Sequence, residues 1–160
     1  MEYTVRKIRE SEYGVLEDFL YLAVFVPDGV EPPPREIVFR PELRVYTEGF
    51  GKRDGDLCLV AETGERIVGA VWTRIMDDYG HIDGETPSLA VSVVPEFRNK
   101  GIGTALMRAM MALLKEEGFR RVSLSVQKAN YARRMYEALG FVTVAEKTEE
   151  CIMENELCCG

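Results

Sequence analysis

The feature that most constrains this chain is a mostly apolar segment that leads through a basic glycine turn into an amphipathic helix. Residues 89–94 form the segment, the turn reads Arg98-Asn99-Lys100-Gly101-Ile102-Gly103, and apolar residues at helical spacing follow as far as Gly118. A strand that turns this tightly into a helix directs the unpaired N–H groups and the positive dipole end of the helix at one point. Glycines without a Cβ let a ligand approach the backbone closely. The pattern therefore predicts a phosphate-binding turn.

Three phosphate-binding turns share this general order, and local residues exclude two of them. A P-loop closes with Gly-Lys followed by Ser or Thr, whereas here Lys100 precedes Gly101 and no Lys precedes Thr104. The dinucleotide fingerprint needs a small residue three positions after Gly103, where this chain has Leu106. The third pattern, Arg-x-x-Gly-x-Gly, fits. With the strand before it, this segment resembles the acetyl-CoA pyrophosphate loop of the GNAT N-acetyltransferase superfamily. The alternative is a plain strand-to-helix turn.

A second segment, residues 130–141, resembles the other GNAT signature, in which Asn opens a helix and Tyr precedes Leu-Gly-Phe. The resemblance implies that Tyr136 is the general acid, because a phenol can hand a proton to the thiolate that leaves a thioester. The alternative is that Tyr136 is only a packed aromatic side chain. Asn130 holds the pantetheine arm of the cofactor or caps the helix, and the two roles are compatible. Arg133 approaches the cofactor phosphates or is a solvated charge.

The resemblance also implies a set of acetyl-CoA contacts. They come from the backbone of the strand, where the pantetheine arm pairs as an extra strand, from the turn and from the later helix. The implied residues are Val91, Val93, Arg98, Asn99, Lys100, Gly101, Ile102, Gly103, Thr104, Asn130, Arg133 and Tyr136. On the later helix, spacing places Tyr131, Met135, Ala138 and Leu139 on one face, which we expect to be core.

The general base is the least constrained part of the site. An amine must lose a proton before it attacks, so a carboxylate or a water relay is required. Glu85 precedes the fourth expected strand and is the candidate base, although Pro87 or Ser88 can take the equivalent position. Nearby polar residues are the alternatives, and a solvated acidic loop explains them equally well. They are Asp77, Asp78, Asp83 and His81.

Composition excludes several classes of protein. Twenty basic against 27 acidic residues argue against a general nucleic-acid binder. No signal-peptide pattern opens the chain, and the apolar run 19–26 is too short to span a bilayer, so we expect a cytoplasmic protein. The four cysteines form no Cys-x-x-Cys pair and His81 is the one histidine, so we expect no metal site. Cys58 and Trp72 are expected in the core, and Cys158-Cys159 in a frayed tail.

The order of apolar and turn segments predicts β-α-α-β-β-β-α-β-α-β-β, which matches the GNAT fold. That fold is α/β (α+β), with a mixed, mostly antiparallel sheet of six to seven strands, about four helices on both faces and a splay between the fourth and fifth strands. We expect residues 1–160 to form a single domain, with the fourth strand near 88–94, the following helix from 102, the fifth strand at 121–126 and the next helix at 129–139.

Three functions remain from different classes. The leading hypothesis is an N-acetyltransferase that moves acetyl from acetyl-CoA to a primary amine of a small molecule or peptide in a ternary complex. The second is a non-catalytic module that binds or senses acyl-CoA. The third is a binder of nucleotide phosphates. The sequence does not choose the acceptor, and a homodimer is left open.

Overall fold

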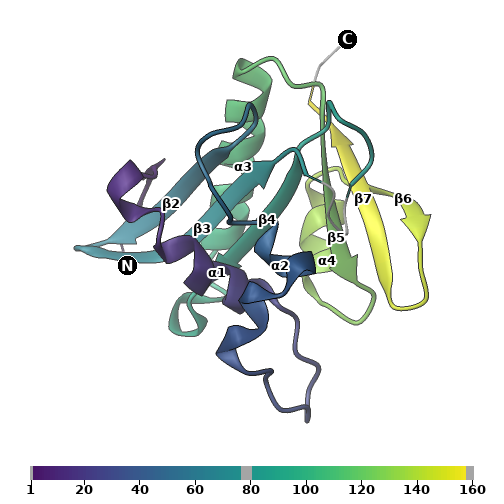
Figure 1. The fold of residues 1–160 in the computed structure, drawn as a ribbon, viewed down its shortest axis with the longest axis horizontal. Coiled ribbons are helices and arrows are strands. Elements are labelled where there is room, and N and C mark those ends of the chain that lie inside the picture. The colour runs from purple at the N-terminus through teal and green to yellow at the C-terminus, as the bar shows by residue number, and fades with distance from the viewer. Residues whose placement is uncertain (1, 77–80, 158–160) are drawn as a thin grey trace.

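A seven-stranded sheet runs through the chain in the order β1-β2-β3-β4-β5-β7-β6 (Figure 1). The computed structural model describes residues 2–76 and 81–157. Every neighbouring pair of strands is antiparallel except β4 and β5, which are parallel. The mixed, mostly antiparallel sheet is therefore confirmed. The strands are β1 Thr4–Lys7, β2 Leu57–Thr63, β3 Arg66–Arg74, β4 Ser88–Val93, β5 Arg121–Gln127, β6 Val142–Glu146 and β7 Glu150–Glu156.

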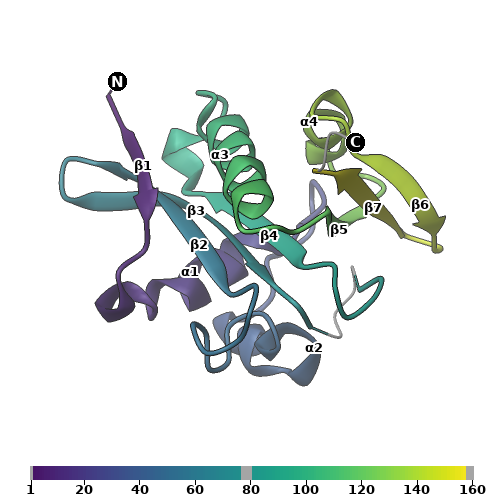
Figure 2. The same ribbon diagram turned by 90° about the horizontal axis from the view of Figure 1, so that it is seen from above.

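Helices cover both faces of this sheet, as expected. Figure 2 shows α3 and α4 on one face and α1 and α2 on the other. The α-helices are α1 Val15–Ala23, α2 Pro41–Arg44, α3 Ile102–Glu116 and α4 Ala132–Ala138, and short 3₁₀ turns occupy Glu10–Glu12, Arg35–Phe39 and Pro95–Phe97. Among the described residues, no helix is both long enough and apolar enough to cross a membrane.

Side-chain alternation along the central strands produces two separate apolar cores. Along β4, Leu89, Val91 and Val93 pack on the α3 side, while Ala90 packs on the α1 side. The first core is anchored by the apolar face of α3, where Leu106, Met110 and Leu114 are fully buried as predicted and Met107, which was not predicted, is fully buried beside them. Burial of each such side chain stabilises the fold by about 1.5–3 kcal/mol. The second core holds Trp72 and Cys58, both buried as expected.

The expected splay between β4 and β5 is present. The two strands have a single register pair, Ser88 with Ser123, and the N–H of Ser123 donates to the carbonyl of Pro87 at 3.0 Å. The hydroxyl oxygens of Ser88 and Ser123 lie 3.5 Å apart. Beyond this point the strands separate, although both continue. A gap therefore opens at the carboxyl ends of β4 and β5, between the two cores.

A buried ion pair holds the segment between α2 and β2 against the sheet. The guanidinium of Arg74, at the end of β3, donates to Asp56 at 3.0 and 3.1 Å, and both side chains are essentially inaccessible. Arg74 also donates to the carbonyls of Val45 and Glu48. Because Asp56 accepts two backbone N–H groups of its own loop as well, the charges are fully satisfied. The sequence reasoning did not anticipate this pair.

Candidate active site

The backbone of β4 directs unpaired groups into the gap. The N–H of Val94 donates to the carbonyl of Val68 on the β3 side at 2.8 Å. Successive residues of an antiparallel strand direct their backbone groups to alternate sides, so the N–H and C=O groups of Val91 and Val93 turn toward β5. The register pairs β5 with β4 at Ser123 alone. The backbone of Val91 therefore lies where an extended ligand can pair with it.

The glycine turn follows β4 and is closed by left-handed backbone. Asn99 has φ 62° and Gly101 has φ 84°, conformations that α3 needs in order to start at Ile102. The first backbone bond of the helix runs from Ala105 N–H to Gly101 C=O, and no side chain caps this end. The N–H groups of the first turn are thus free for an anion. A Cβ placed on Gly101 would meet no atom within 4 Å, so the space beside the turn is open.

Two basic side chains flank this turn. The Nε of Arg98 donates to the carbonyl oxygen of Val93 at 3.0 Å, which ties the turn to the last residue of β4. Lys100 is exposed. Their charges add to the positive end of α3 in a chain whose net charge is −7. The turn is therefore a local positive site, and its binding of an anion stays a prediction.

Tyr136 lies in the core on the α3 and α4 side, where 8% of its surface is exposed. Its ring packs beside Phe141, with centroids 5.9 Å apart. Burial raises the pKa of Tyr136 from 10.0 to about 12. No hydrogen bond of its hydroxyl is found within residues 2–76 and 81–157. The phenol therefore keeps its proton at neutral pH, as a general acid must.

The start of α4 differs from the expectation in one respect. The side-chain oxygen of Asn130 accepts a hydrogen bond from the N–H of Ala132 at 2.9 Å, so Asn130 caps the helix, one of its two expected roles. Tyr131 was expected in the core, and this is wrong: its surface is 79% exposed and Arg134 lies over its ring. Ala138 is exposed as well. Because α4 begins after Tyr131, the buried helical face consists of later residues. Arg133 is half-buried.

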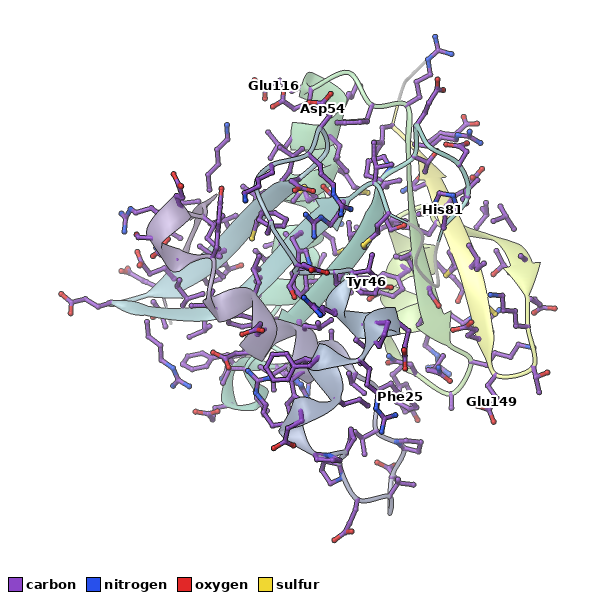
Figure 3. The ribbon with its side chains drawn as sticks, in the orientation of Figure 1. Phe25, Tyr46, Asp54, His81, Glu116 and Glu149 are labelled. Atoms are coloured by element: carbon purple, nitrogen blue, oxygen red, sulfur yellow. The ribbon has the colours of Figure 1, made fainter. Side chains whose placement is uncertain are left out.

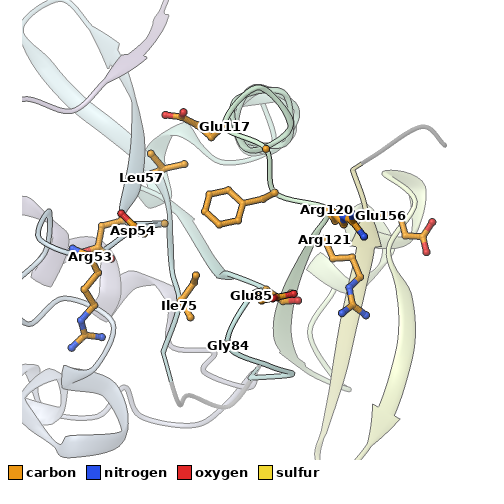
Figure 4. A pocket seen from close by; sticks show the side chains of 15 residues that line it. Arg53, Asp54, Leu57, Ile75, Gly84, Glu85, Glu117, Arg120, Arg121 and Glu156 are labelled. Atoms are coloured by element: carbon orange, nitrogen blue, oxygen red, sulfur yellow. The ribbon is translucent and has the colours of Figure 1, made fainter.

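Glu85 lies at the other end of β4 from the glycine turn. It lines an open cavity of about 1070 Å³ beside the end of α3, together with Phe119, Arg120 and Arg121 (Figure 4). Figure 3 shows Asp54 and Glu116 at this end of the molecule, and Phe25 and Glu149 at the opposite end. A strand of this length spans about 20 Å. The structure does not bring Glu85 to the turn that bears Gly101.

The other candidate bases are engaged elsewhere or lie outside the described residues. Asp83 accepts from the N–H of Glu85 at 2.9 Å and pairs with Arg121 at 2.8 Å. The hydrogen bonds from Glu85 and Thr86, with the charge of Arg121, hold the pKa of Asp83 below its usual range. His81 contacts the carbonyl of Met76 through Nδ1 at 2.8 Å. Asp77, Asp78, Cys158 and Cys159 lie outside the described residues. Within the described ranges, no three His, Cys, Asp or Glu residues gather to hold a metal.

One polar pair beside the gap was missed by the sequence reasoning. The hydroxyl of Ser125, on β5, donates to Glu150, on β7, at 2.9 Å. Both side chains lie on the face opposite α3 and α4, because Val126 and Cys151, their neighbours in sequence, are buried in the first core. Only the register of β5 against β7 brings these two residues together. The sequence signal was weak, because Glu150 is one of three glutamates in β7, and only the apolar Cys-Ile-Met segment that follows it indicates a strand.

Comparisons with known proteins agree with this arrangement. A family model described as the acetyltransferase (GNAT) family matches residues 21–141. An uncharacterised N-acetyltransferase of Archaeoglobus fulgidus is 31% identical over 136 residues, covering 81% of this chain and 88% of the relative. A mycothiol acetyltransferase of Propionibacterium freudenreichii is 34% identical over 90 residues, but the match covers 56% of this chain and 28% of that protein.

Solved structures share the fold. The PaiA N-acetyltransferase of Thermoplasma acidophilum, solved in complex with coenzyme A, has a TM-score of 0.72 at 18% identity, covering 98% of this chain and 99% of that one. The glycine turn and the residues 130–141 segment both lie within the part that the family model matches. Because the family model matches well over half of this chain, the chain belongs to the acetyltransferase (GNAT) family.

Proposed function

We propose that this chain transfers the acetyl group of acetyl-CoA to the primary amine of a small molecule or peptide, by direct attack in a ternary complex. One observation carries the proposal. The strands β4 and β5 separate after Ser88 and Ser123, the backbone of Val91 turns into the gap, and the uncapped start of α3 stands at the end of β4. A long ligand with an anionic end and an amide-rich arm fits this arrangement.

The residues present suit acetyl-CoA as cosubstrate. The N–H groups of Ile102, Gly103 and Thr104 would receive the pyrophosphate, with Arg98 and Lys100 adding charge. The amides of the pantetheine arm would pair with the backbone of Val91, as a strand pairs with a sheet edge. The carbonyl of Val93 already accepts from Arg98, so its contribution to that pairing is limited to its second lone pair. Asn99, Asn130 and Arg133 flank the same path.

The proposed chemistry follows from these placements. The neutral amine attacks the acetyl carbonyl, the C–N bond forms and the C–S bond breaks. Tyr136 supplies a proton to the leaving sulfur and recovers one from the nitrogen through solvent. Its raised pKa supports this role, because the acid form is present at any physiological pH. The acceptor loses its first proton to a carboxylate or to water, and Glu85 is the sequence candidate for that step.

The names of the relatives bear on the acceptor. The Archaeoglobus protein is named as an N-acetyltransferase and the Propionibacterium protein for mycothiol. The first name favours a nitrogen acceptor here. The second belongs to a protein of which this chain covers 28%, so mycothiol is not transferred to this chain. We propose that the segment between α1 and α2 and the turn between β6 and β7 shape the acceptor site, because both lie at the open end of the gap (Figure 1).

A thiol-release screen tests the proposal. The protein is mixed with acetyl-CoA and, in turn, spermidine, kanamycin, lysine and a short peptide with a free N-terminus. Release of CoA above the rate without amine, together with the acetylated amine by mass spectrometry, supports the proposal. Binding of acetyl-CoA without release in any mixture would identify a non-catalytic acyl-CoA module instead. Thermal stabilisation by ATP and not by CoA would indicate a nucleotide binder.

A further inference from the structure

None of the described helices covers one half of the sheet on the side away from α3 and α4. In Figure 2, α1 and α2 lie under β2, β3 and β4, and none of the described helices lies under β5, β7 and β6. The residues of β5 and β7 that face this side are mainly polar, and register pairs them across the two strands. They include Ser123, Ser125, Glu150 and Glu154. Ser123 is fully buried and Ile152 is 8% exposed, so this face is accessible in part, at side chains such as those of Glu150 and Glu154.

Glu150, like Glu154, is a carboxylate on this face that is held in place and still partly accessible. Its Oε2 accepts the Ser125 hydroxyl at 2.9 Å, and its side chain is 17% exposed. Glu154, four residues on, already pairs with the guanidinium of Arg121 at 3.5 Å. That guanidinium also binds Asp83. Glu150 thus differs from its neighbours because no guanidinium of the described residues neutralises it.

A primary ammonium group already lies beside Glu150. The Nζ of Lys147 is 3.6 Å from its Oε1, on a turn where the lysine side chain is 54% exposed. Such an exposed ion pair contributes about 0–1 kcal/mol, so another ammonium can replace it. The position therefore binds the chemical group that the proposed acceptor carries.

The position of Glu150 relative to the gap is also suitable. Ser125 lies two residues beyond Ser123, where β5 last pairs with β4, which places it about 7 Å past the point of separation. Tyr136 is buried on the opposite face, in the core that α3 and α4 cover. An acid for the sulfur and a carboxylate for the amine would then approach the gap from the two faces of the sheet.

We propose that Glu150 binds the acceptor as a primary ammonium and takes its proton, with Ser125 as the residue that positions the carboxylate. The proposal rests on the proposed function for its acyl donor. Glu150 removes one proton from the ammonium nitrogen, whose freed lone pair then forms the C–N bond as the C–S bond breaks. The carboxylic acid returns its proton to solvent. Glu85, in the cavity at the far end of β4, is the competing base.

The test compares Glu150→Gln with Glu149→Gln. Glu149 is exposed, and among the described contacts only its backbone carbonyl bonds, to Lys128, so its variant makes the same charge change one residue away. Two measurements are made: titration calorimetry of the CoA-loaded protein with spermidine, kanamycin, lysine and the peptide, and kcat/KM for CoA release. Glu150→Gln should weaken the binding of the best amine by about 10–100-fold. It should lower kcat/KM by about 10²–10⁴-fold, while Glu149→Gln matches wild type.

Each other outcome decides against one proposal or the other. The role of Glu150 would be overturned by any of three results. Glu150→Gln could keep the amine affinity and turnover of the wild type, every amine could fail to bind the wild type, or the loss of activity could be confined to Glu85→Gln. Amine binding that depends on Glu150, without CoA release by the wild type, would keep the ammonium site and reject the proposed function. If Glu150→Gln does not fold, Ser125→Ala carries the test. It should lower kcat with unchanged acetyl-CoA affinity, and Ser125→Thr should restore kcat.

Discussion

The Nε of Arg98 donates a hydrogen bond of 3.0 Å to the carbonyl oxygen of Val93, which closes the glycine turn onto the end of β4. Arg98 therefore has two tasks in this fold: it sets the position of the turn and it brings positive charge to an anion site. A lysine has no planar fork and a weaker geometric preference, so it would supply the charge without the same bond.

We expect Arg98→Ala to weaken CoA binding by about 10–100-fold, since a charge-assisted hydrogen bond contributes roughly 1.5–3 kcal/mol. Arg98→Lys should recover part of this loss. Titration calorimetry with CoA measures it. Arg108→Ala, on the exposed side of α3, removes the same charge away from the turn and serves as the control. Equal affinities for the Arg98 and Arg108 variants would show that Arg98 has no special part in the site.

Gly101 provides a prediction with a close internal control. Gly101 and Gly64 both have positive φ (84° and 61°), and a Cβ on either would meet no atom within 4 Å. Alanine should therefore destabilise the fold about equally at both positions, by roughly 1–2 kcal/mol of backbone strain. Only Gly101→Ala should also weaken CoA binding, because its methyl group would occupy the space that the pyrophosphate needs. If Gly64→Ala loses the same CoA affinity, the loss in Gly101→Ala is due to lower stability alone.

Tyr136→Phe separates catalysis from packing. The hydroxyl has no partner among the described residues, so its removal should leave the free energy of unfolding and the acetyl-CoA affinity nearly unchanged. We expect kcat to fall by about 10²–10⁴-fold, the usual contribution of a general acid. Steady-state kinetics at saturating acetyl-CoA measures this. Full kcat in the phenylalanine variant would leave Tyr136 as a core residue only.

Local patterns predicted the parts of this structure that depend on local physics. The periodicity of Leu106, Met110 and Leu114 predicted α3, because a single buried helical face leaves a direct signature in sequence. Tyr131 was misplaced because the same spacing was extended one residue before α4 begins. Helix starts depend on a cap, here Asn130, as much as on periodicity.

The residues that the sequence did not predict are those paired across long separations. Arg74 meets Asp56, and Ser125 meets Glu150, through strand register and loop packing. A one-residue change of register would turn each side chain to the other face, so no local pattern contains these contacts. For the same reason local sequence indicates a candidate base in the loop next to β4, where Glu85 lies, and gives no signal for the proposed role of Glu150 on β7.

The pKa of Tyr136 predicts a loss of stability in alkali. Because its folded-state pKa of about 12 is above the ordinary 10.0, the folded protein holds the phenolic proton more tightly. That stabilisation is complete below pH 10 and is lost as the pH rises toward 12. Urea unfolding of wild type and Tyr136→Phe across this range should show the wild type losing up to about 3 kcal/mol more. Parallel curves for the two proteins would mean that the phenol is not desolvated.

The buried Arg74–Asp56 pair should control the stability of the segment that α2 begins. Arg74→Met leaves the carboxylate of Asp56 buried without its counter-charge, which typically lowers the free energy of unfolding by about 3–5 kcal/mol. The exposed pair Arg66–Glu96, at 3.3 Å, is the control, because Arg66→Met should change stability by about 0–1 kcal/mol. Urea unfolding followed by circular dichroism compares the two. If Arg74→Met lowers the free energy of unfolding no more than Arg66→Met, the loop does not depend on the ion pair for its stability. If the loss is large, adding Asp56→Asn should restore part of it, because no unpaired charge then remains.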